Sequence, residues 1–287
     1  MSRQVLFVVH AGRQRALEVS RAAATGLLAN GISVLCADDD AQLIGIDGVL
    51  PANDAQGCEL VIVFGGDGTI LRAIEIARPH DVPVLGVNLG HVGFLAEAEP
   101  EDIASVISAV TEGNLIVEER TALVVTTTSP EGDEWSTWAL NEVAIEKHQR
   151  ERMAEIMVSV DGQPLSRWSC DGLLCATPTG STAYAFSAGG PVVWPEVDAL
   201  LVVPISAHAL FARPLVVSPN SHIDVGIENG PVIVSADGRR STVVATGGKV
   251  EVVRDKQSVK LARVHTTPFT ERLVAKFELP VRGWRNS

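Results

Sequence analysis

The chain has 287 residues, 46% of them hydrophobic, with 23 basic against 35 acidic residues and a formal net charge of -12. This length and apolar content suffice for one large domain or two smaller domains whose cores need no disulfides. The acidic balance argues against general binding to nucleic acid or to a membrane surface. No apolar run is long enough to span a bilayer and no signal-peptide pattern is present, so we expect a cytoplasmic protein.

Four cysteines, Cys36, Cys58, Cys170 and Cys175, form no CxxC pair and have no histidine at zinc-binding spacing. We therefore expect free thiols that are buried in a reducing compartment.

The N-terminal part alternates short apolar runs with segments of helical periodicity. Strands are predicted at 5–9, 32–35, 60–64 and 83–87, and helices over 13–30, 70–77 and 100–111. Residues 37–57 are acidic and poorly periodic, and we expect a mobile loop there. The alternation predicts a parallel sheet with helices on its faces, which binds ligands beyond the carboxyl ends of its strands.

Helical periodicity fades after residue 119, and short strand candidates follow one another. These strands are predicted at 122–128, 140–146, 155–160, 172–177, 200–205, 215–218, 222–228, 232–235, 249–254 and 258–264. Asp161-Gly162 and Asp237-Gly238 are hairpin turn signals.

The predicted fold therefore has two domains. We expect an α/β N-terminal domain with a parallel sheet over 1–118 and a β-rich, sandwich-like, antiparallel C-terminal domain over 119–265. A tail over 266–287, helical at 268–276, is expected to pack back on the first domain.

The turn Gly65-Gly66-Asp67-Gly68-Thr69 joins a predicted buried strand to a predicted helix. Glycines permit positive φ and close approach of a ligand. A helix N-terminus offers N–H groups and partial positive charge to an anion. A carboxylate in a loop that only held phosphate would repel its ligand. Asp67 therefore indicates a group that takes a proton from a nucleophile, or holds a metal, beside a bound phosphate.

Two more polar clusters stand out. Asn141-Glu142 interrupts an apolar run that is predicted to be a strand. One interpretation is an edge strand with one solvated face. The other is a binding site, because an amide and a carboxylate can hydrogen-bond sugar hydroxyls or a base edge. The run Thr177-Pro178-Thr179-Gly180-Ser181-Thr182-Ala183-Tyr184 has four hydroxyls in six residues, which suit a polar-ligand loop or a helix cap. Asp171, alone, is typical of a turn. The P-loop, the protein-kinase catalytic set and the GxSxG elbow are absent from the sequence.

These clusters, with Asn88-Leu89-Gly90-x-x-Gly93-Phe94-Leu95 and Asp171-Gly172, resemble the motifs of NAD kinases and occur in that family's order. The glycine-rich turn alone also resembles that of diacylglycerol kinases, sphingosine kinases and phosphofructokinases. The segment from Pro268 to Trp284 is similar to the tail of actinobacterial members.

The resemblance implies transfer of a phosphoryl group from ATP or polyphosphate to the 2′-hydroxyl of the adenosine ribose of NAD, with Mg²⁺, in a homodimer or homotetramer. Asp67 matches the family's proton acceptor. The phosphate-facing turn of the family corresponds to Gly65, Gly66, Gly68 and Thr69. The residues that contact adenosine correspond to Asn141 and Glu142. The other implied NAD contacts are Asp67 itself, Gly68, Arg72, Arg152, Asp171, Thr182, Ala183, Tyr184, Ala185, Phe186 and Ser187. No protein ligand of the metal is assigned.

One segment departs from the family pattern. Many members read Pro-Ile-Cys-Pro-His where this chain has Pro204-Ile205-Ser206-Ala207-His208, so the predicted site leaves this segment out. Two alternatives remain at this point. A lipid kinase would share the glycine-rich turn but needs an apolar acceptor pocket, and a non-catalytic NAD(P) sensor would bind nucleotide without turnover.

Overall fold

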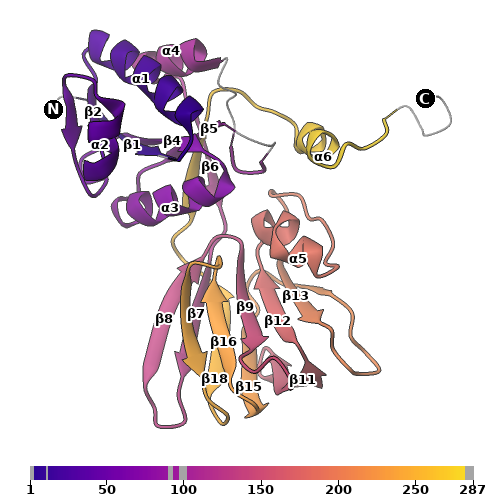
Figure 1. Cartoon of the computed structure of the whole chain (residues 1–287). Coiled ribbons are helices and arrows are strands. Elements are labelled where there is room, and N and C mark those ends of the chain that lie inside the picture. The colour runs from indigo at the N-terminus through magenta and orange to yellow at the C-terminus, as the bar shows by residue number, and fades with distance from the viewer. Residues whose placement is uncertain (1–2, 11, 90–92, 97–101, 282–287) are drawn as a thin grey trace. The chain divides into compact units, whose positions relative to one another are not determined.

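Two compact units make up the chain. The computed structural model describes residues 3–10, 12–89, 93–96 and 102–281. Residues 1–119 and 259–287 form the first unit, and residues 120–258 form the second. Helices alternate with strands in the first unit, whereas strands dominate the second (Figure 1). Across the described parts of the chain, no helix is both long and apolar enough to cross a membrane.

A seven-stranded sheet forms the centre of the first unit, in the order β3-β2-β1-β4-β5-β19-β6. Its strands are β1 (Gln4–Val9), β2 (Ser33–Cys36), β3 (Val49–Pro51), β4 (Leu60–Gly65), β5 (Val84–Asn88), β6 (Ile116–Arg120) and β19 (Val259–Arg263). Every neighbouring pair from β3 to β19 is parallel, which confirms the predicted sheet. β4 is buried along its whole length, as its continuous apolar run requires.

Helices cover both faces of this sheet (Figure 1). α1 (Gln14–Ala29) and α4 (Ile103–Glu112) bury Leu27 and Val106 in one shared core, and α3 (Asp67–Ala77) lies on the opposite face. Shorter helices are α2 (Asp38–Ile44), η1 (Arg78–His80) and α6 (Phe269–Phe277). The predicted helices over 13–30 and 70–77 are confirmed. The helix expected from residue 100 starts at Ile103, and residues 97–101 lie outside the described part of the chain.

The loop expected over 37–57 is wrong, because this segment contains α2 and β3. A helix of seven residues is marginal by itself and needs tertiary contacts. Arg21 supplies them by donating to the carbonyls of Leu43 and Ile44, both at 2.8 Å, and Gly45 ends the helix in the left-handed conformation. Arg21 is distant in sequence, so local periodicity carries no signal for this helix.

The strand expected over 258–264 exists, but its predicted place in the β-rich domain is wrong. β19 pairs in parallel with β5, with Leu261 opposite Val84, and so belongs to the sheet of the first unit. An apolar pattern identifies a strand, whereas the choice of sheet depends on contacts that are remote in sequence.

Two six-stranded antiparallel sheets form the second unit. One, the β10 sheet, has the order β11 (Gln163–Cys170), β10 (Ala154–Val160), β15 (Ile223–Asn229), β18 (Lys249–Arg254), β7 (Leu123–Thr128) and β8 (Glu134–Ala139). The other, the β9 sheet, has the order β14 (Leu215–Val217), β13 (Leu200–Ile205), β12 (Gly172–Ala176), β9 (Glu142–Lys147), β16 (Val232–Ala236) and β17 (Arg240–Val244). Side chains of both sheets share one core around Trp168, so the sandwich is confirmed.

Both predicted hairpin turns are confirmed. Asp161 and Asp237 each adopt φ of +52°, followed by a glycine with positive φ, and they connect β10 to β11 and β16 to β17. The returning strands β11 and β17, together with β8, are polar and were not predicted. They are held by pairing with their hairpin partners rather than by an apolar pattern of their own.

The four cysteines are free and buried, as expected. Burial raises the pKa of the Cys36 and Cys175 thiols to about 12 and that of Cys58 and Cys170 to about 11. All four thiols therefore stay protonated at neutral pH.

Candidate active site

Asp67 stands at the N-terminus of α3, immediately after β4. The backbone N–H groups of Phe94 and Leu95 donate to its two carboxylate oxygens, each at 3.2 Å. β5 ends at Asn88, which is aligned with Gly65 at the end of β4. Both glycine-rich segments therefore leave the carboxyl edge of the sheet, as predicted, and the second segment orients the carboxylate of the first.

The glycines of this turn have different reasons to be glycine. None of Gly65, Gly66 and Gly68 adopts positive φ, so that expected reason is wrong. A Cβ on Gly65 would lie 2.5 Å from the Thr69 hydroxyl oxygen, so Gly65 is required by packing. A Cβ on Gly66 or Gly68 would meet no atom of a described residue within 4 Å. The described residues therefore leave open space over these two glycines.

Arg72, on the second turn of α3, is paired with Asp40 of α2. The Nη2–Oδ2 distance is 3.2 Å, the Asp40 side chain is 8% exposed and the Arg72 side chain is 43% exposed. The structure thus gives this predicted contact residue a buried anionic partner that sequence analysis did not foresee.

The C-terminal helix α6 contacts the segment that orients Asp67. The ring of Phe94 lies 5.9 Å from that of Phe269 and 6.0 Å from that of Phe277, centroid to centroid. The Arg272 guanidinium donates to the Phe94 carbonyl at 3.1 Å. Gly90 and Trp284, two residues of the predicted motifs, lie outside the described residues.

In the second unit, Asn141 lies in a bend, and β9 starts at Glu142 rather than at residue 140. The Asp237 carboxylate holds this bend by accepting from the N–H groups of Leu140 at 2.9 Å, Asn141 at 2.7 Å and Glu142 at 3.4 Å. Arg240 pairs with Asp237 at 3.0 Å. From the sequence, Asp237 is predicted only as a turn residue, because nothing in its Asp-Gly pattern distinguishes it from Asp161.

Glu142 is a buried acid, 7% exposed, and its Oε2 has no hydrogen-bond partner among the described residues. Burial, with a smaller contribution from the charge of Asp237, raises the pKa of Glu142 to about 8. A hydrogen bond from the Tyr184 backbone opposes this rise. The side chain is therefore a protonated, incompletely bonded group that can donate to a ligand oxygen at neutral pH.

Four further side chains join Glu142 in one polar cluster. The Tyr184 hydroxyl donates to Glu146 at 2.8 Å, and Lys147 pairs with Asp171 at 2.6 Å. Burial and the bond to Glu146 raise the pKa of Tyr184 to about 12. The bond from Lys147 holds the pKa of Asp171 below its usual range.

The hydroxyl-rich run 177–184 forms η3 (Thr179–Thr182) and leads into α5 (Tyr184–Ser187). Two of its hydroxyls serve the fold: Thr177 donates to the Leu140 carbonyl at 2.6 Å, and Ser181 donates to the Val193 carbonyl at 3.1 Å. A Cβ on Gly180 would lie 1.9 Å from the Asn141 carbonyl oxygen, so this run packs directly on the Asn141 bend.

The other predicted contacts are spread along the same elements. Thr182 and Ala183 are half-buried, whereas Phe186 and Ser187 are exposed on α5. Ala185 is fully buried, and its methyl group belongs to the core with Leu174. Arg152 is exposed in the loop between β9 and β10 and forms no hydrogen bond or ion pair with a described residue.

The segment that sequence analysis excluded touches the site. The Ser206 side chain hydrogen-bonds the Asp171 carboxylate, and the charge of His208 also lowers the pKa of that acid. Ser206 has φ of +50°, an uncommon conformation for a residue other than glycine. The segment therefore lies next to Asp171, a contact that its divergent sequence does not indicate.

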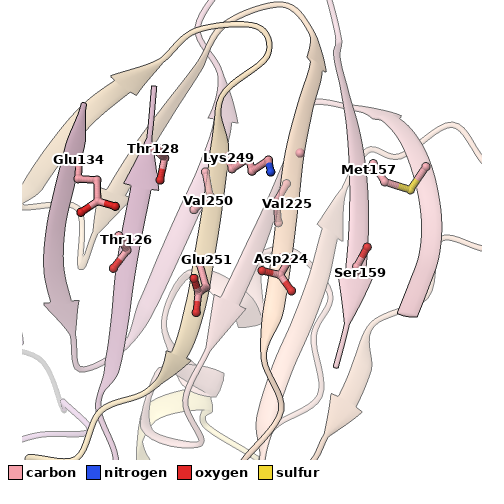
Figure 2. A pocket seen from close by; sticks show the side chains of 11 residues that line it. Thr126, Thr128, Glu134, Met157, Ser159, Asp224, Val225, Lys249, Val250 and Glu251 are labelled. Carbon is pink, nitrogen blue, oxygen red and sulfur yellow. The ribbon is translucent and has the colours of Figure 1, made fainter. Parts of the chain in front are cut away.

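A cavity of about 380 Å³ lies elsewhere, on the solvent-facing side of the β10 sheet (Figure 2). Its walls include Thr126, Asp224, Lys249 and Glu251, and no predicted site residue lines it. Asp224 and Glu251 are cross-strand neighbours. Mixed polar side chains of this kind are typical of the solvated face of an antiparallel sheet.

The described residues contain no group of three or more His, Cys, Asp or Glu side chains that could hold a metal by themselves. Each oxygen of Asp67 accepts one N–H and retains lone pairs. Mg²⁺ is commonly held by one or two carboxylates together with substrate phosphates. Asp67 therefore fits a metal that arrives with a phosphate ligand.

The glycine-rich turn at a parallel-sheet edge, combined with a β-sandwich unit, places the chain among the kinases that share this turn. Residues 5–115 match the family model of the ATP-NAD kinase N-terminal domain, and residues 140–264 match that of the C-terminal domain. The chain belongs to the NAD kinase family.

Curated relatives agree over the full length. The chain is 49% identical to the NAD kinase of Thermobifida fusca, covering 99% of this chain and 92% of the relative. It is also 49% identical to NAD kinase 2 of Streptomyces avermitilis, covering 100% and 98%. These matches to actinobacterial NAD kinases confirm the resemblance and the enzyme class, and they favour an NAD kinase over a lipid kinase.

Two solved structures share the fold. The crystal structure of yeast NADH kinase complexed with NADH has a TM-score of 0.91 and 24% identity, over 100% of this chain and 90% of that one. An NAD kinase from Archaeoglobus fulgidus in complex with ATP has a TM-score of 0.69 and 28% identity, over 91% and 93%.

Proposed function

We propose that this NAD kinase transfers the terminal phosphoryl group of ATP to the 2′-hydroxyl of the adenosine ribose of NAD, and that Asp67 accepts the hydroxyl proton. The observation that carries the proposal is the Asp67 carboxylate, oriented by two backbone N–H groups at a helix N-terminus with open space over Gly66 and Gly68. An acid fixed beside an anion-binding helix terminus suits a hydroxyl that attacks a phosphate.

A ribose hydroxyl is a poor nucleophile, and a positioned general base contributes ~10²–10⁴-fold to such reactions. Asp67 takes the proton as the new O–P bond forms, while the bond between the γ-phosphorus and the leaving ADP oxygen breaks. Because Phe94 and Leu95 hold both carboxylate oxygens, the base needs little reorganisation when the substrate arrives.

The donor phosphates are assigned to the turn from Gly65 to Thr69. Gly66 and Gly68 let the backbone approach a phosphate closely, and the first N–H groups of α3 have no partner within the helix. Mg²⁺, held by Asp67 and the substrate phosphates, would neutralise charge on the transferring group. Arg72 is assigned to a substrate phosphate because its side chain is 43% exposed and its guanidinium has one bond to a described residue, Asp40.

The acceptor is assigned to the polar cluster of the second unit. Glu142, with one unpartnered buried oxygen, and Asn141 would bind the adenosine part of NAD. Asp171, the η3–α5 segment from Thr182 to Ser187 and Arg152 would supply further contacts. Ser206 joins this set as a partner of Asp171.

We also propose a homodimer or homotetramer. The proposal is supported by apolar side chains at the surface of the second unit: Trp194, Phe211 and Val216 are 44–56% exposed. Light scattering of the purified protein would measure the mass, and a monomer at all concentrations would contradict this assignment.

One assay tests the main proposal. NADP formation is measured from NAD, ATP and Mg²⁺, and again with polyphosphate as donor and NADH as acceptor. A protein that binds NAD without forming NADP from any donor would be a sensor, and the proposal would fail.

The variant Asp67→Asn tests the role of the base. It should bind NAD normally but lose at least ~10²-fold in kcat, the lower range for loss of a general base. Wild-type turnover by this variant would contradict the assignment of Asp67.

A further inference from the structure

Arg72 and Asp40 form an ion pair in which the aspartate is buried and the arginine is partly exposed. The Asp40 side chain is 8% exposed and that of Arg72 is 43% exposed, with a single Nη2–Oδ2 contact of 3.2 Å. Arginine has five N–H donors in a planar fork. The remaining donors of Arg72 make no hydrogen bond with a described residue. Nη2 is therefore held by Asp40, and the other N–H groups of the guanidinium are available to a ligand.

Both residues of the pair lie on helices. Asp40 lies in α2, whose C-terminus is held by hydrogen bonds from Arg21 to the carbonyls of Leu43 and Ile44. Arg72 lies in α3, the helix that also carries Asp67. The position of the Arg72 guanidinium is therefore fixed relative to the helix that begins at the proposed base.

The surroundings of Asp40 leave Arg72 as its cationic partner. Cys36, at the end of β2, senses the charges of both Asp40 and Arg72, and its thiol stays neutral because its pKa is raised to about 12. A buried carboxylate without a counter-charge is strongly unfavourable, so Asp40 constrains Arg72 to remain near it.

We propose that Asp40 is a positioning residue for phosphoryl transfer, which holds the guanidinium of Arg72 in the orientation that binds a substrate phosphate. This inference rests on the proposed function of Arg72. A free arginine side chain has rotamer entropy, part of which it loses on binding a ligand. Asp40 fixes part of that freedom during folding, so less is lost when the phosphate binds.

The competing explanation is that the pair only ties α2 to α3. That role predicts a loss of stability with no change in substrate affinity. The positioning role predicts a change in KM that disappears when Arg72 is already absent. A double-mutant cycle separates the two, because it isolates the coupling between residues in contact.

The experiment compares wild type, Asp40→Asn, Arg72→Gln and the double variant, with KM for NAD and for ATP, kcat and Tm measured for each. Asp81→Asn is the matched control, because it breaks another acid–base pair of the first unit, with Lys260, away from Arg72. Asp40→Glu, which keeps the charge, provides the conservative rescue, and Asp40→Ser replaces Asp40→Asn if the latter does not fold.

Asp40→Asn should raise KM for one substrate roughly tenfold, the size expected for one charge-assisted hydrogen bond, while kcat changes little. Arg72→Gln should raise the same KM, and the double variant should be no worse than Arg72→Gln. Asp40→Glu should recover part of the loss, and Asp81→Asn should leave KM unchanged.

The results that would overturn the inference are distinguishable from one another. If Arg72→Gln leaves both KM values unchanged, the proposed function of Arg72 is wrong. If Arg72→Gln raises KM but Asp40→Asn lowers only Tm, or if the two effects are additive, Asp40 is a structural residue and does not position Arg72. If Asp40→Asn does not fold, Asp40→Ser takes its place, and a wild-type KM in that variant refutes positioning.

Discussion

Gly93 lies so close to Asp67 that no side chain fits between them: a Cβ on Gly93 would be 2.3 Å from the Asp67 Oδ1 atom. The next two residues, Phe94 and Leu95, donate to the same carboxylate. The segment after β5 therefore contacts the proposed base through its backbone. Residue 93 must be a glycine because a side chain there would collide with the Asp67 carboxylate.

The variant Gly93→Ala should displace the Asp67 carboxylate. A shift of about 1 Å in a reacting group can cost ~10²-fold, so we expect a kcat loss of that order, together with a moderate fall in Tm. Gly26→Ala is the matched control, because its Cβ would press on Ile107 at 2.6 Å, away from Asp67. Equal kcat in both variants would show that Gly93 does not matter for the base.

The variant Gly68→Ala should separate stability from activity. Gly68 lies inside α3, and its Cβ would meet no atom of a described residue within 4 Å. Alanine is favoured over glycine in helices by up to about 1 kcal/mol. We therefore expect an unchanged or higher Tm but a raised KM for ATP, because the added methyl group occupies space assigned to a phosphate. An unchanged KM for ATP, measured by initial rates, would contradict the assigned position of the phosphate.

The variant Asp237→Asn tests whether the Asn141–Glu142 bend is stabilised by the negative charge of the Asp237 carboxylate. Asparagine also tolerates positive φ, so the hairpin should persist while the bonds to three N–H groups and to Arg240 weaken. We expect a loss of roughly 1.5–3 kcal/mol in unfolding free energy, as for hydrogen bonds to charged groups, and a higher KM for NAD.

Asp161→Asn is the control for that experiment. Asp161 has the same φ of +52° in the other Asp-Gly hairpin, and it accepts from the His222 N–H at 2.9 Å and the Ser221 hydroxyl at 3.1 Å. It should lose stability without any change in the KM for NAD. Equal KM changes in both variants would mean that Asp237 has no specific role in the acceptor site.

The buried Glu142 predicts an unusual dependence of stability on pH. Its pKa is about 8 in the folded state against 4.5 for an unperturbed glutamate, so between these values only the unfolded chain loses the proton. The contribution of Glu142 to the unfolding free energy is therefore complete below about pH 4.5 and falls as pH rises towards 8, by about 1.4 kcal/mol per unit.

Glu142→Gln removes this titration while keeping the shape of the side chain. Its stability should match wild type near pH 5 and exceed it near pH 8, as measured by denaturant unfolding at several pH values. A difference between the two proteins that stays constant from pH 5 to pH 8 would show that Glu142 is ionised throughout.

Much of the active-site architecture is visible in local sequence. The buried strand β4, the turn at Asp67 and helix α3 follow from a continuous apolar run, three glycines and helical periodicity, all within one short segment. The Asp-Gly hairpins at Asp161 and Asp237 are equally local, because their conformation is set by two residues.

The functional partners of these segments are not local. Asp237 contacts the Asn141 bend across 96 positions, and Asp40 meets Arg72 across 32. Ser206 was excluded because its segment departs from the family pattern, yet it bonds Asp171. Hydrogen bonds between such distant residues leave no periodic trace in either segment.

By itself, the sequence determined most of the element types, the acid in the glycine-rich turn and the family, since each depends on short patterns of residues. Only the tertiary structure decided that β19 joins the parallel sheet, that Gly93 makes room for Asp67, and that Glu142 is an acid with a raised pKa. Sheet membership, close approach and burial are properties of surfaces brought together by folding, so they are set by residues far along the chain.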